Sequence, residues 1–338
     1  MNIASRVKNF CTDNHLVRPN DKIIIGISGG PDSVALTHIL HHVQYSWGLK
    51  LHLAHVNHHL RRGANHDQAF VEKLARGMNL PLSVHHRKNL KKKKRGSIEE
   101  LAREERLDFF TKLAKKINAD TIALAHTQND LAETVLMRIL RGTGLQGLRA
   151  ILPFKKMRGI TLIRPLLSLK KKDIIQYLKN HRLRYCLDAT NQDTAFFRNK
   201  IRHHLLPLLE RHYNPNIQES LQNLAQNSAT DYDYLISQSQ ALYKKLTKKN
   251  PRRGEVHLPL TALRKNPLAL QRLVFRLSFA DLKGDTNQLT LSHIQKIEQL
   301  VTSYPTGAGV VLPSKICITK NEKNLKWVSP SGAKPSFK

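Results

Sequence analysis

The sequence predicts an α/β protein in which a doubly wound, Rossmann-like parallel sheet is followed by a second, mainly helical domain that ends in a small β hairpin. Short apolar runs alternate with helical stripes up to about residue 205, which is typical of βαβ units. Polar or glycine-rich clusters follow several of these runs, and open α/β sheets bind ligands at the carboxyl ends of their strands. Beyond residue 205 long helical patterns take over. We therefore expect a catalytic domain at 1–205 and a second domain at 206–338.

The first predicted strand, Ile23–Gly26, leads into a loop that suits a phosphate. Two adjacent glycines allow backbone angles that other residues avoid, so that consecutive N–H groups can point at one anion. Asp32 and Ser33 fall in the first turn of the next helix, where free N–H donors and the helix dipole attract negative charge. We expect Asp32 to act through Mg²⁺ or to face a second substrate, and a simple tight turn is the structural alternative. The candidate binding loop comprises Ser28, Gly29, Gly30, Pro31, Asp32 and Ser33.

The second predicted strand, residues 51–56, ends in a run of imidazole, amide and guanidinium side chains from His55 to Arg62. This position at the carboxyl end of a strand favours nucleotide recognition, with His55 and Asn57 as candidate binding residues. A metal site at His55 and His58 is the alternative, but no third ligand lies at a suitable spacing.

A helix at 65–78 and a strand at 80–86 follow, and then a basic run from Lys88 to Arg95. That run is typical of a solvated loop, or of a loop that adds salt-sensitive contacts to a phosphate backbone. The next predicted helix opens with a capping box, and Arg103 and Arg106 lie one turn apart on it. They either form ordinary ion pairs with nearby glutamates or present two guanidinium groups to the site.

The buried run Thr121–Ala125 predicts another strand, and a second polar cluster follows it at residues 126–130. His126 and Asp130 are candidates for a general base and for a metal or amine ligand. An isolated histidine is more often structural, but a place beside a nucleotide loop favours a functional role. A helix then runs to residue 140, with Glu133 one turn along it.

Three glycines lie close together in the next segment, Arg141–Leu148, which we interpret as a structured loop at the nucleotide site with Arg141 and Gly142 as binding residues. A plain linker would contain more serine, proline or acid. A helix at 170–181 follows, and then Arg198 and Arg202 fall on one helical face.

The second half carries no catalytic cluster. Helical patterns at 217–246, 269–282 and 291–303 precede a tail that predicts a hairpin within 309–328. This domain either positions RNA or has a purely structural or dimerising role.

The composition predicts a polyanionic partner and a reducing compartment. The 338 residues include 56 Lys and Arg against 25 Asp and Glu, a net charge of +31 that exceeds what solubility requires. Cys11, Cys186 and Cys317 form no C-x-x-C pair, which argues against a disulfide framework, a zinc ribbon or an iron–sulfur site. No apolar stretch approaches the roughly 18 residues of a membrane span, and no signal peptide is evident. We therefore expect a cytoplasmic protein without membrane contact.

The loop Ser28–Ser33 resembles the pyrophosphate-binding loop of the N-type ATP pyrophosphatases, which adenylylate a substrate oxygen and release pyrophosphate. Over most of residues 20–210 the series of motifs resembles the tRNA(Ile)-lysidine synthetase family, which implies an adenine nucleotide alpha hydrolase-like fold. The further motifs, in chain order, are His55–Arg61, the pair Arg103 and Arg106, His126–Thr134, Arg141–Leu148 and Arg198–Arg202.

This resemblance implies that ATP and Mg²⁺ are used to join free L-lysine to carbon 2 of the wobble cytidine of an isoleucine tRNA with a CAU anticodon. The reaction would pass through an adenylated cytidine and release pyrophosphate and AMP. ATP would lie over the glycine loop, with Asp32 and Asp130 as metal ligands. His126 and Asp130 would generate the free amine, while Arg106 and Arg198 would stabilise phosphate charge or hold the RNA.

One position departs from the family pattern. Two acids usually follow the histidine of the cluster at residues 126–130, and here the first of them is Asn129. This leaves open how many carboxylates are available to Mg²⁺ or to lysine.

Three other functions are weaker interpretations of the same motifs. A thiolating tRNA enzyme of the superfamily would need cysteine chemistry, and the cysteines are unpaired. A non-catalytic RNA-binding protein would not need the intact loop with Asp32, His126 and Asp130. A small-molecule amidotransferase leaves the net charge of +31 unexplained.

Overall fold

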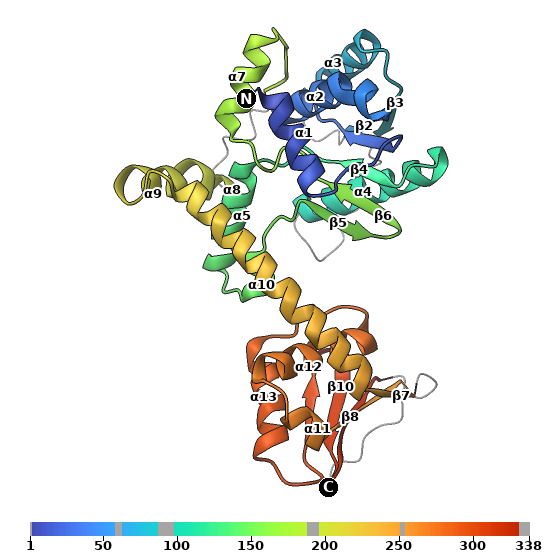
Figure 1. Cartoon of the computed structure of the whole chain (residues 1–338), viewed down its shortest axis with the longest axis vertical. Helices are drawn as coiled ribbons and strands as arrows, with labels where there is room; N and C mark the ends of the chain where they lie inside the picture. Colours follow the sequence, from blue (N-terminus) through green and yellow to red (C-terminus); the bar gives the residue numbers. More distant parts are fainter. Residues whose placement is uncertain (1, 58–62, 87–97, 188–195, 251–253, 331–338) are drawn as a thin grey trace. The chain divides into compact units, whose positions relative to one another are not determined.

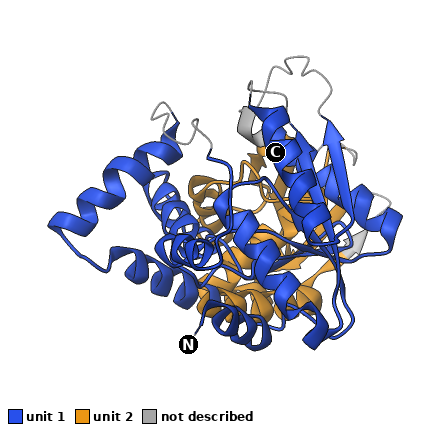
Figure 2. Ribbon diagram, turned by 90° about the horizontal axis from the view of Figure 1, so that it is seen from above, with its two compact units in different colours: residues 1–229 blue, residues 230–338 orange. Residues whose placement is uncertain are grey.

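The computed structural model shows two compact units, Met1–Ala229 and Thr230–Lys338 (Figures 1 and 2). This division falls later in the chain than the predicted boundary at 205/206. His58 of the alternative metal site and the basic run at 88–95 lie outside the described residues. The structure describes residues 2–57, 63–86, 98–187, 196–250 and 254–330.

A six-stranded sheet lies at the centre of the first unit, in the strand order β3-β2-β1-β4-β6-β5 (Figure 1). Neighbouring strands are parallel except at one edge, where β5 pairs antiparallel with β6. Residues 23–25 of the central strand are fully buried, because helices cover both faces of the sheet. The strands are β1 (Lys22–Gly26), β2 (Lys50–Asn57), β3 (Leu82–His86), β4 (Thr121–Ala123), β5 (Phe154–Met157) and β6 (Ile160–Ile163).

The two faces of the sheet have separate apolar cores. Ile23 and Ile25 pack with residues of α1, α2, α3 and α7, whereas Ile24 packs on the other face with Phe110 of α4. This alternation follows from the two-residue period of a strand. Helices on both faces of a mostly parallel sheet confirm the predicted fold class. The helices are α1 (Ile3–Asp13), α2 (Pro31–Trp47), α3 (Ala64–Gly77), α4 (Ile98–Ile117) and α7 (Lys171–Asn180).

The order of the strands reverses at β1. The chain adds β2 and β3 on one side of β1, and then crosses over to add β4 and β6 on the other side. Ligands of open α/β sheets bind outside the carboxyl ends of the strands at such a reversal. The loop after β1 and the segment after β4 therefore meet at one edge, which is where the candidate site lies.

A further group of helices packs against α5 in the same unit. Leu131 and Val135 of α5 share an apolar cluster with Ile201, Leu206 and Leu221. The last two residues come after the predicted domain boundary, which explains why the compact unit extends to residue 229. The elements are α5 (Gln128–Leu140), α6 (Leu145–Leu148), α8 (Phe197–Lys200), a π-helix (Ile201–Leu205), α9 (Leu206–His212) and α10 (Ile217–Leu246).

The second unit has its own core between helices and a five-stranded antiparallel sheet with the order β7-β8-β11-β10-β9. Trp327 and Phe275 are fully buried there, with ring centroids 6.3 Å apart. The predicted hairpin is present as β10 and β11, and it belongs to this larger sheet. The elements are β7 (Lys248–Asn250), β8 (Glu255–Pro259), α11 (Leu260–Arg264), α12 (Leu268–Lys283), α13 (Leu291–Thr302), β9 (Gly309–Leu312), a 3₁₀ turn (Pro313–Lys315), β10 (Ile316–Lys320) and β11 (Asn324–Val328).

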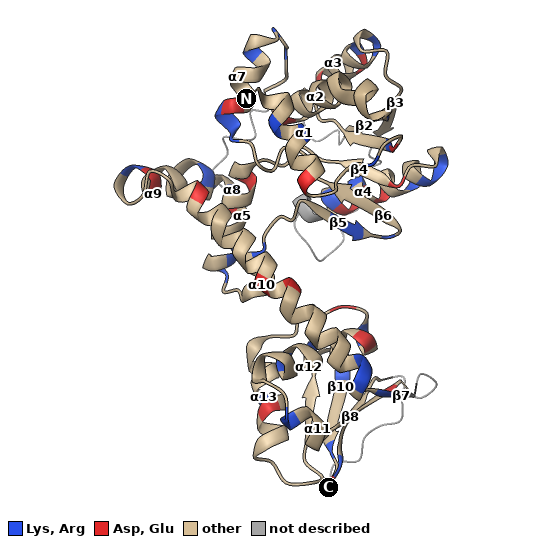
Figure 3. Cartoon of the chain, in the orientation of Figure 1, with Lys and Arg blue, Asp and Glu red and all other residues tan. Residues whose placement is uncertain are grey.

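Basic residues recur along the elements of both units (Figure 3). Lys and Arg outnumber Asp and Glu by 56 to 25 in the whole chain. Among the described residues, no helix combines the length and the apolar character needed to cross a bilayer.

Gly26 ends β1 where α4 packs on the sheet, and a side chain there has no room. An added Cβ would lie 3.0 Å from Leu124 Cδ2 and 3.0 Å from Phe110 Cζ. We expect Gly26→Ala to lower the free energy of unfolding by about 1–3 kcal/mol, because the packed side chains must shift. Urea unfolding of the purified protein measures this change.

The matched control is Gly77→Ala, at the end of α3, where no atom lies within 4 Å of an added Cβ. It should leave the unfolding free energy unchanged or raise it by up to about 1 kcal/mol, because alanine favours a helix. Equal losses in the two variants would contradict the packing argument.

Candidate active site at the carboxyl edge of the parallel sheet

The loop between β1 and α2 is held closed by its own serine hydroxyls. The Ser28 amide donates to Ser33 Oγ (3.2 Å), and the Ser33 hydroxyl donates to the Gly30 carbonyl (2.9 Å). Gly29 has a φ of +85°, which L side chains rarely adopt. Pro31 begins the helix, so the first-turn N–H groups and the positive end of the helix dipole face the loop. This arrangement is an anion site of the kind predicted from the sequence.

Asp32 pairs with a lysine that the sequence analysis missed. Lys171 Nζ, at the start of α7, lies 2.5 Å from Asp32 Oδ2. The other oxygen, Oδ1, is buried and has no hydrogen-bond partner among the described residues. Burial raises the pKa of Asp32, and the Lys171 ammonium opposes that shift. Asp32 therefore offers a buried oxygen that suits a hard cation.

The two candidates on β2 differ in what they can still bind. His55 is buried, its Nδ1 lies 2.9 Å from the Ile27 carbonyl, and its Nε2 has no partner in the described chain. Burial lowers the pKa of His55. Asn57 is also buried, but its amide donates to Gln68 Oε1 (2.9 Å) and Asn65 Oδ1 (3.2 Å) on α3. His55 can therefore take a ligand, whereas Asn57 fixes the start of α3.

His126 follows β4 and presents an uncharged imidazole at neutral pH. Its Nδ1 is buried without a partner in the part of the chain that the structure describes. Burial lowers the pKa of His126 to about 4, and Asp130 opposes the shift. With that pKa the imidazole is a hydrogen-bonding group and only a weak base.

Asp130 is fully engaged within the protein. Its Oδ2 accepts the Thr127 amide (2.8 Å) and hydroxyl (2.9 Å) in the capping box of α5, and its Oδ1 accepts Arg198 (2.7 Å). The pKa of Asp130 is lowered: burial would raise it, but the Arg198 guanidinium and its other partners outweigh that effect. The geometry gives this carboxylate a positioning role and leaves it little capacity to hold a metal or accept a proton.

Glu133 and the two predicted arginines complete the same network. Glu133 is almost fully buried and accepts Arg198 Nε (2.7 Å) and Arg202 Nε (2.6 Å). Arg198 lies just before the π-helix and Arg202 lies in its first residues, so that both guanidinium groups reach the acids of α5. Removing one partner of a buried ion pair typically costs about 3–5 kcal/mol. Arg198 is thus held by acids of α5, and the role that the resemblance implies for it, stabilising phosphate charge or holding the RNA, stays a prediction.

A cluster of guanidinium groups lies beyond the acids. The cluster comprises Arg103 and Arg106 of α4, Arg138 of α5 and Arg164 after β6. Burial is the main cause that lowers the pKa of the last three, and the nearby Arg103 guanidinium lowers each of them further. The pKa of Arg164 falls to about 10. Buried Nε atoms of Arg106 and Arg164 have no partner among the described residues. This cluster suits phosphate groups.

Arg141 and Gly142 follow the carboxyl end of α5, and their predicted role at the nucleotide stays a prediction. Asp130 is in the first turn of α5 and Arg141 follows its last residue, so that roughly 17 Å of helix separates them. The Arg141 guanidinium lies 5.3 Å from the centroid of the Phe197 ring. Phe197 lines an open groove of about 560 Å³ that we call the α8–α9 groove, together with Leu140, Lys200, Leu208 and Arg211 among others.

Asn129 connects three helices by directed hydrogen bonds. Its Oδ1 accepts the first amide of α7, from Lys171 (2.8 Å), and its Nδ2 donates to Gln218 Oε1 on α10 (2.6 Å). The Gln218 amide in turn donates to Glu210 (2.5 Å). The departure from the family pattern is therefore built into the packing around Lys171.

The fold and these side chains are those of a nucleotide-binding protein: a glycine loop at a helix N-terminus, two uncharged imidazoles and guanidinium groups whose Nε atoms have no partner among the described residues lie at the carboxyl edge of a parallel sheet. Comparison with family models agrees, since residues 1–209 match the PP-loop domain and residues 258–319 match the TilS substrate binding domain. The solved structure of the U34-tRNA thiolase NcsA from Methanococcus maripaludis has the same fold, with a TM-score of 0.55 at 18% identity, over 66% of this chain and 78% of that one.

Curated relatives identify the family more closely. The tRNA(Ile)-lysidine synthase of Symbiobacterium thermophilum is 37% identical over 314 residues, which cover 89% of this chain and 64% of the relative. That of Clostridioides difficile is 32% identical over 329 residues, which cover 96% of this chain and 70% of the relative. The chain belongs to the tRNA(Ile)-lysidine synthase family, and it spans about two thirds of the length of these relatives.

Asn129→Asp should destabilise the protein, although it restores the usual family residue. A carboxylate cannot donate to Gln218 Oε1, and turning the Gln218 amide would aim its oxygen at the Glu210 carboxylate. We expect the free energy of unfolding in urea to fall by about 1–3 kcal/mol, the cost of an unpaired buried polar group.

The double variant Asn129→Asp with Glu210→Gln should recover part of that loss, because the amide introduced at position 210 can donate to the oxygen of a turned Gln218 amide. An Asn129→Asp protein as stable as the wild type would show that the hydrogen-bond chain does not fix residue 129.

Proposed function

We propose that this protein uses ATP and Mg²⁺ to join free L-lysine to carbon 2 of the wobble cytidine of an isoleucine tRNA with a CAU anticodon. The observation that carries the proposal is a set of buried polar atoms at one sheet edge with no partner among the described residues: Asp32 Oδ1, His55 Nε2, Arg106 Nε and His126 Nδ1. Because buried polar atoms are normally paired, this edge suits a polar ligand. Membership of the tRNA(Ile)-lysidine synthase family supports the choice of reaction.

The phosphates of ATP fit the loop Ser28–Ser33 at the start of α2, with His55 beside it for the nucleotide. Asp32 suits Mg²⁺ through its buried free oxygen, whereas both oxygens of Asp130 already accept hydrogen bonds. Mg²⁺ supplies charge neutralisation of the phosphates when it is bound. The Lys171 ammonium, which is a flexible point charge, then leaves the Asp32 carboxylate and pairs with a phosphate oxygen of ATP.

The proposed reaction has two displacements. The cytosine oxygen at carbon 2 forms a bond to the α-phosphorus, and the bond to pyrophosphate breaks. The ε-ammonium of lysine loses a proton to solvent, and the resulting amine forms a bond to carbon 2. The bond from carbon 2 to the oxygen breaks, AMP leaves, and the nitrogen releases a second proton to solvent. Arg106 and Arg164 stabilise the phosphate charge, while Asp130 and Arg198 hold α5 in place so that His126 accepts a hydrogen bond from the incoming amine.

The RNA partner is supported by charge and by the second unit. The net charge of +31 favours a polyanion, and the match to a substrate binding domain at residues 258–319 lies within the second unit. In the first unit the α8–α9 groove combines the aromatic Phe197 with Lys200 and Arg211. Aromatic rings stack on bases, and such cations bind backbone phosphates. A tRNA substrate would place the protein in the cytoplasm.

The decisive assay incubates the protein with ATP, Mg²⁺, labelled lysine and isoleucine tRNA with a CAU anticodon. We expect label to enter the tRNA and AMP to form in equal amount. Asp32→Asn and Lys171→Ala should each reduce the rate by about 100-fold or more, because each removes a charge that acts on the phosphates.

Matched controls are available for both variants. Asp108→Asn removes an exposed acid of α4, and Lys172→Ala removes the exposed lysine next to Lys171; both should keep the wild-type rate. AMP that forms equally fast with and without lysine, with no label in the tRNA, would overturn the proposed nucleophile. Binding of tRNA with no AMP at all would favour a non-catalytic RNA-binding protein.

Lys200→Glu and Arg211→Glu should weaken tRNA binding if the α8–α9 groove contacts the backbone. We expect each to lower the slope of log affinity against log salt by about 1, in filter binding without ATP. The control Lys179→Glu reverses an exposed lysine of α7. An equal loss in that variant would show a general charge effect and no contact at the groove.

A further inference from the structure

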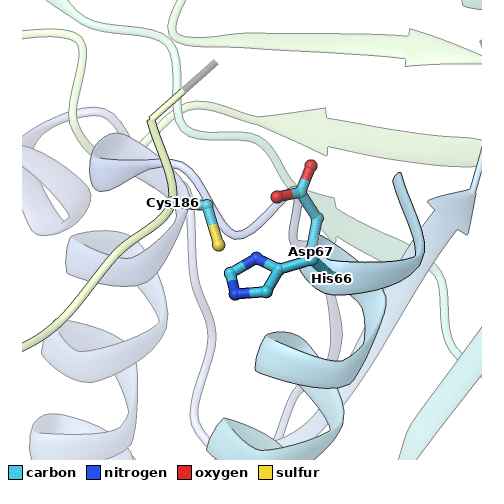
Figure 4. Close-up of side chains that lie close together, drawn as sticks. All are labelled: His66, Asp67 and Cys186. Carbon is cyan, nitrogen blue, oxygen red and sulfur yellow. The ribbon is translucent and has the colours of Figure 1, made fainter. Parts of the chain in front are cut away.

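Three side chains from two distant parts of the sequence meet beside the nucleotide loop. His66 and Asp67 lie in the first turn of α3, and Cys186 lies after α7 (Figure 4). One donor atom from each, an imidazole nitrogen, a carboxylate oxygen and the thiol sulfur, lies within 4.8 Å of the other two. The donors thus surround one point in space.

The backbone holds two of these donors in place. The Asp67 amide donates to the Gly63 carbonyl (3.1 Å) as α3 begins, and the Asp67 side chain is buried. The Cys186 amide donates to the Gly29 carbonyl (2.9 Å), and its sulfur lies 3.5 Å from where a Cβ on Gly29 would be. His66 is exposed, so its ring can adjust. Two fixed donors and one adjustable donor form a site that can close around an ion.

The donor set selects the ion by its chemistry. Ligands of tetrahedral zinc lie about 2.0–2.3 Å from the metal and therefore about 3.3–3.8 Å from one another, which small side-chain movements can reach here. A thiolate with an imidazole favours Zn²⁺ over Mg²⁺ or Ca²⁺, which prefer oxygen donors. One cysteine is too few for an ordinary iron–sulfur cluster.

We propose that His66, Asp67 and Cys186 bind one Zn²⁺ ion, with the fourth position open to water. The ion would link the segment after α7 to the start of α3, beside Gly29 of the nucleotide loop. On binding, the thiol loses its proton to solvent and the sulfur forms a bond to the metal. The sequence analysis missed this site because no C-x-x-C spacing marks it. The proposal does not depend on the reaction proposed above.

Cobalt titration of the full chain, stripped of metal with a chelator, tests the site. We expect one equivalent of Co²⁺ to give the absorption of a thiolate-bound tetrahedral ion, and one equivalent of Zn²⁺ to remove it. Cys186→Ser should abolish the thiolate absorption. His66→Ala should weaken Zn²⁺ binding in competition titrations by about tenfold or more. Zn²⁺ should also raise the melting temperature of the wild type and not that of Cys186→Ser.

Cys317→Ser and His42→Ala are the matched controls, since they remove a half-buried thiol of the second unit and an exposed imidazole of α2. Both should bind Co²⁺ like the wild type. Circular dichroism confirms that each variant is folded. A thiolate band that persists in Cys186→Ser, or a wild type with no saturable site at one equivalent, would overturn the proposal.

Discussion

Two carboxylates of α5, the buried Glu133 and the half-buried Asp130, are paired with cations, and these ion pairs determine how the carboxyl edge of the sheet is built. Arg198 of α8 and Arg202 of the π-helix supply the cations, with four close contacts between 2.6 and 3.0 Å. Because an unpaired buried charge is so costly, the later helices cannot leave α5 without loss of several kcal/mol. The network thereby holds in place the capping box of α5, and with it the position of His126.

The same network decides the charge that the site presents. Its two acids are neutralised internally, while Arg106 and Arg164 keep buried nitrogens without partners among the described residues. Asp32 is paired with one lysine only, a mobile point charge, whereas Asp130 is enclosed by guanidinium groups and a helix cap. The edge is thus poised to accept anions, and Asp32 is the acid whose partner can be exchanged.

Sequence periodicity and motif order predicted the parallel sheet, its helices and the loop Ser28–Ser33, because these depend on local patterns. The hairpin of β5 and β6 was missed, since Phe154–Met157 has no strict alternation and β6 is only four residues long. Missing β6 also hid Arg164, which follows it. Lys171 could not be found because its partner, Asp32, is distant in sequence, and spacing reports only contacts within one element.

The amide at residue 129 shows how the site tolerates a missing acid. A second carboxylate there would lie next to the Lys171 amide and face Gln218 Oε1, where an acceptor is already present. The Asn129 side chain supplies both an acceptor for α7 and a donor for α10, which no carboxylate can do. The lysine that pairs with Asp32 lies at the start of α7. Because residue 129 is neutral, it does not compete with Asp32 for this lysine. The departure from the family pattern therefore changes which residues hold α7 in place and leaves the carboxylate of the nucleotide loop intact.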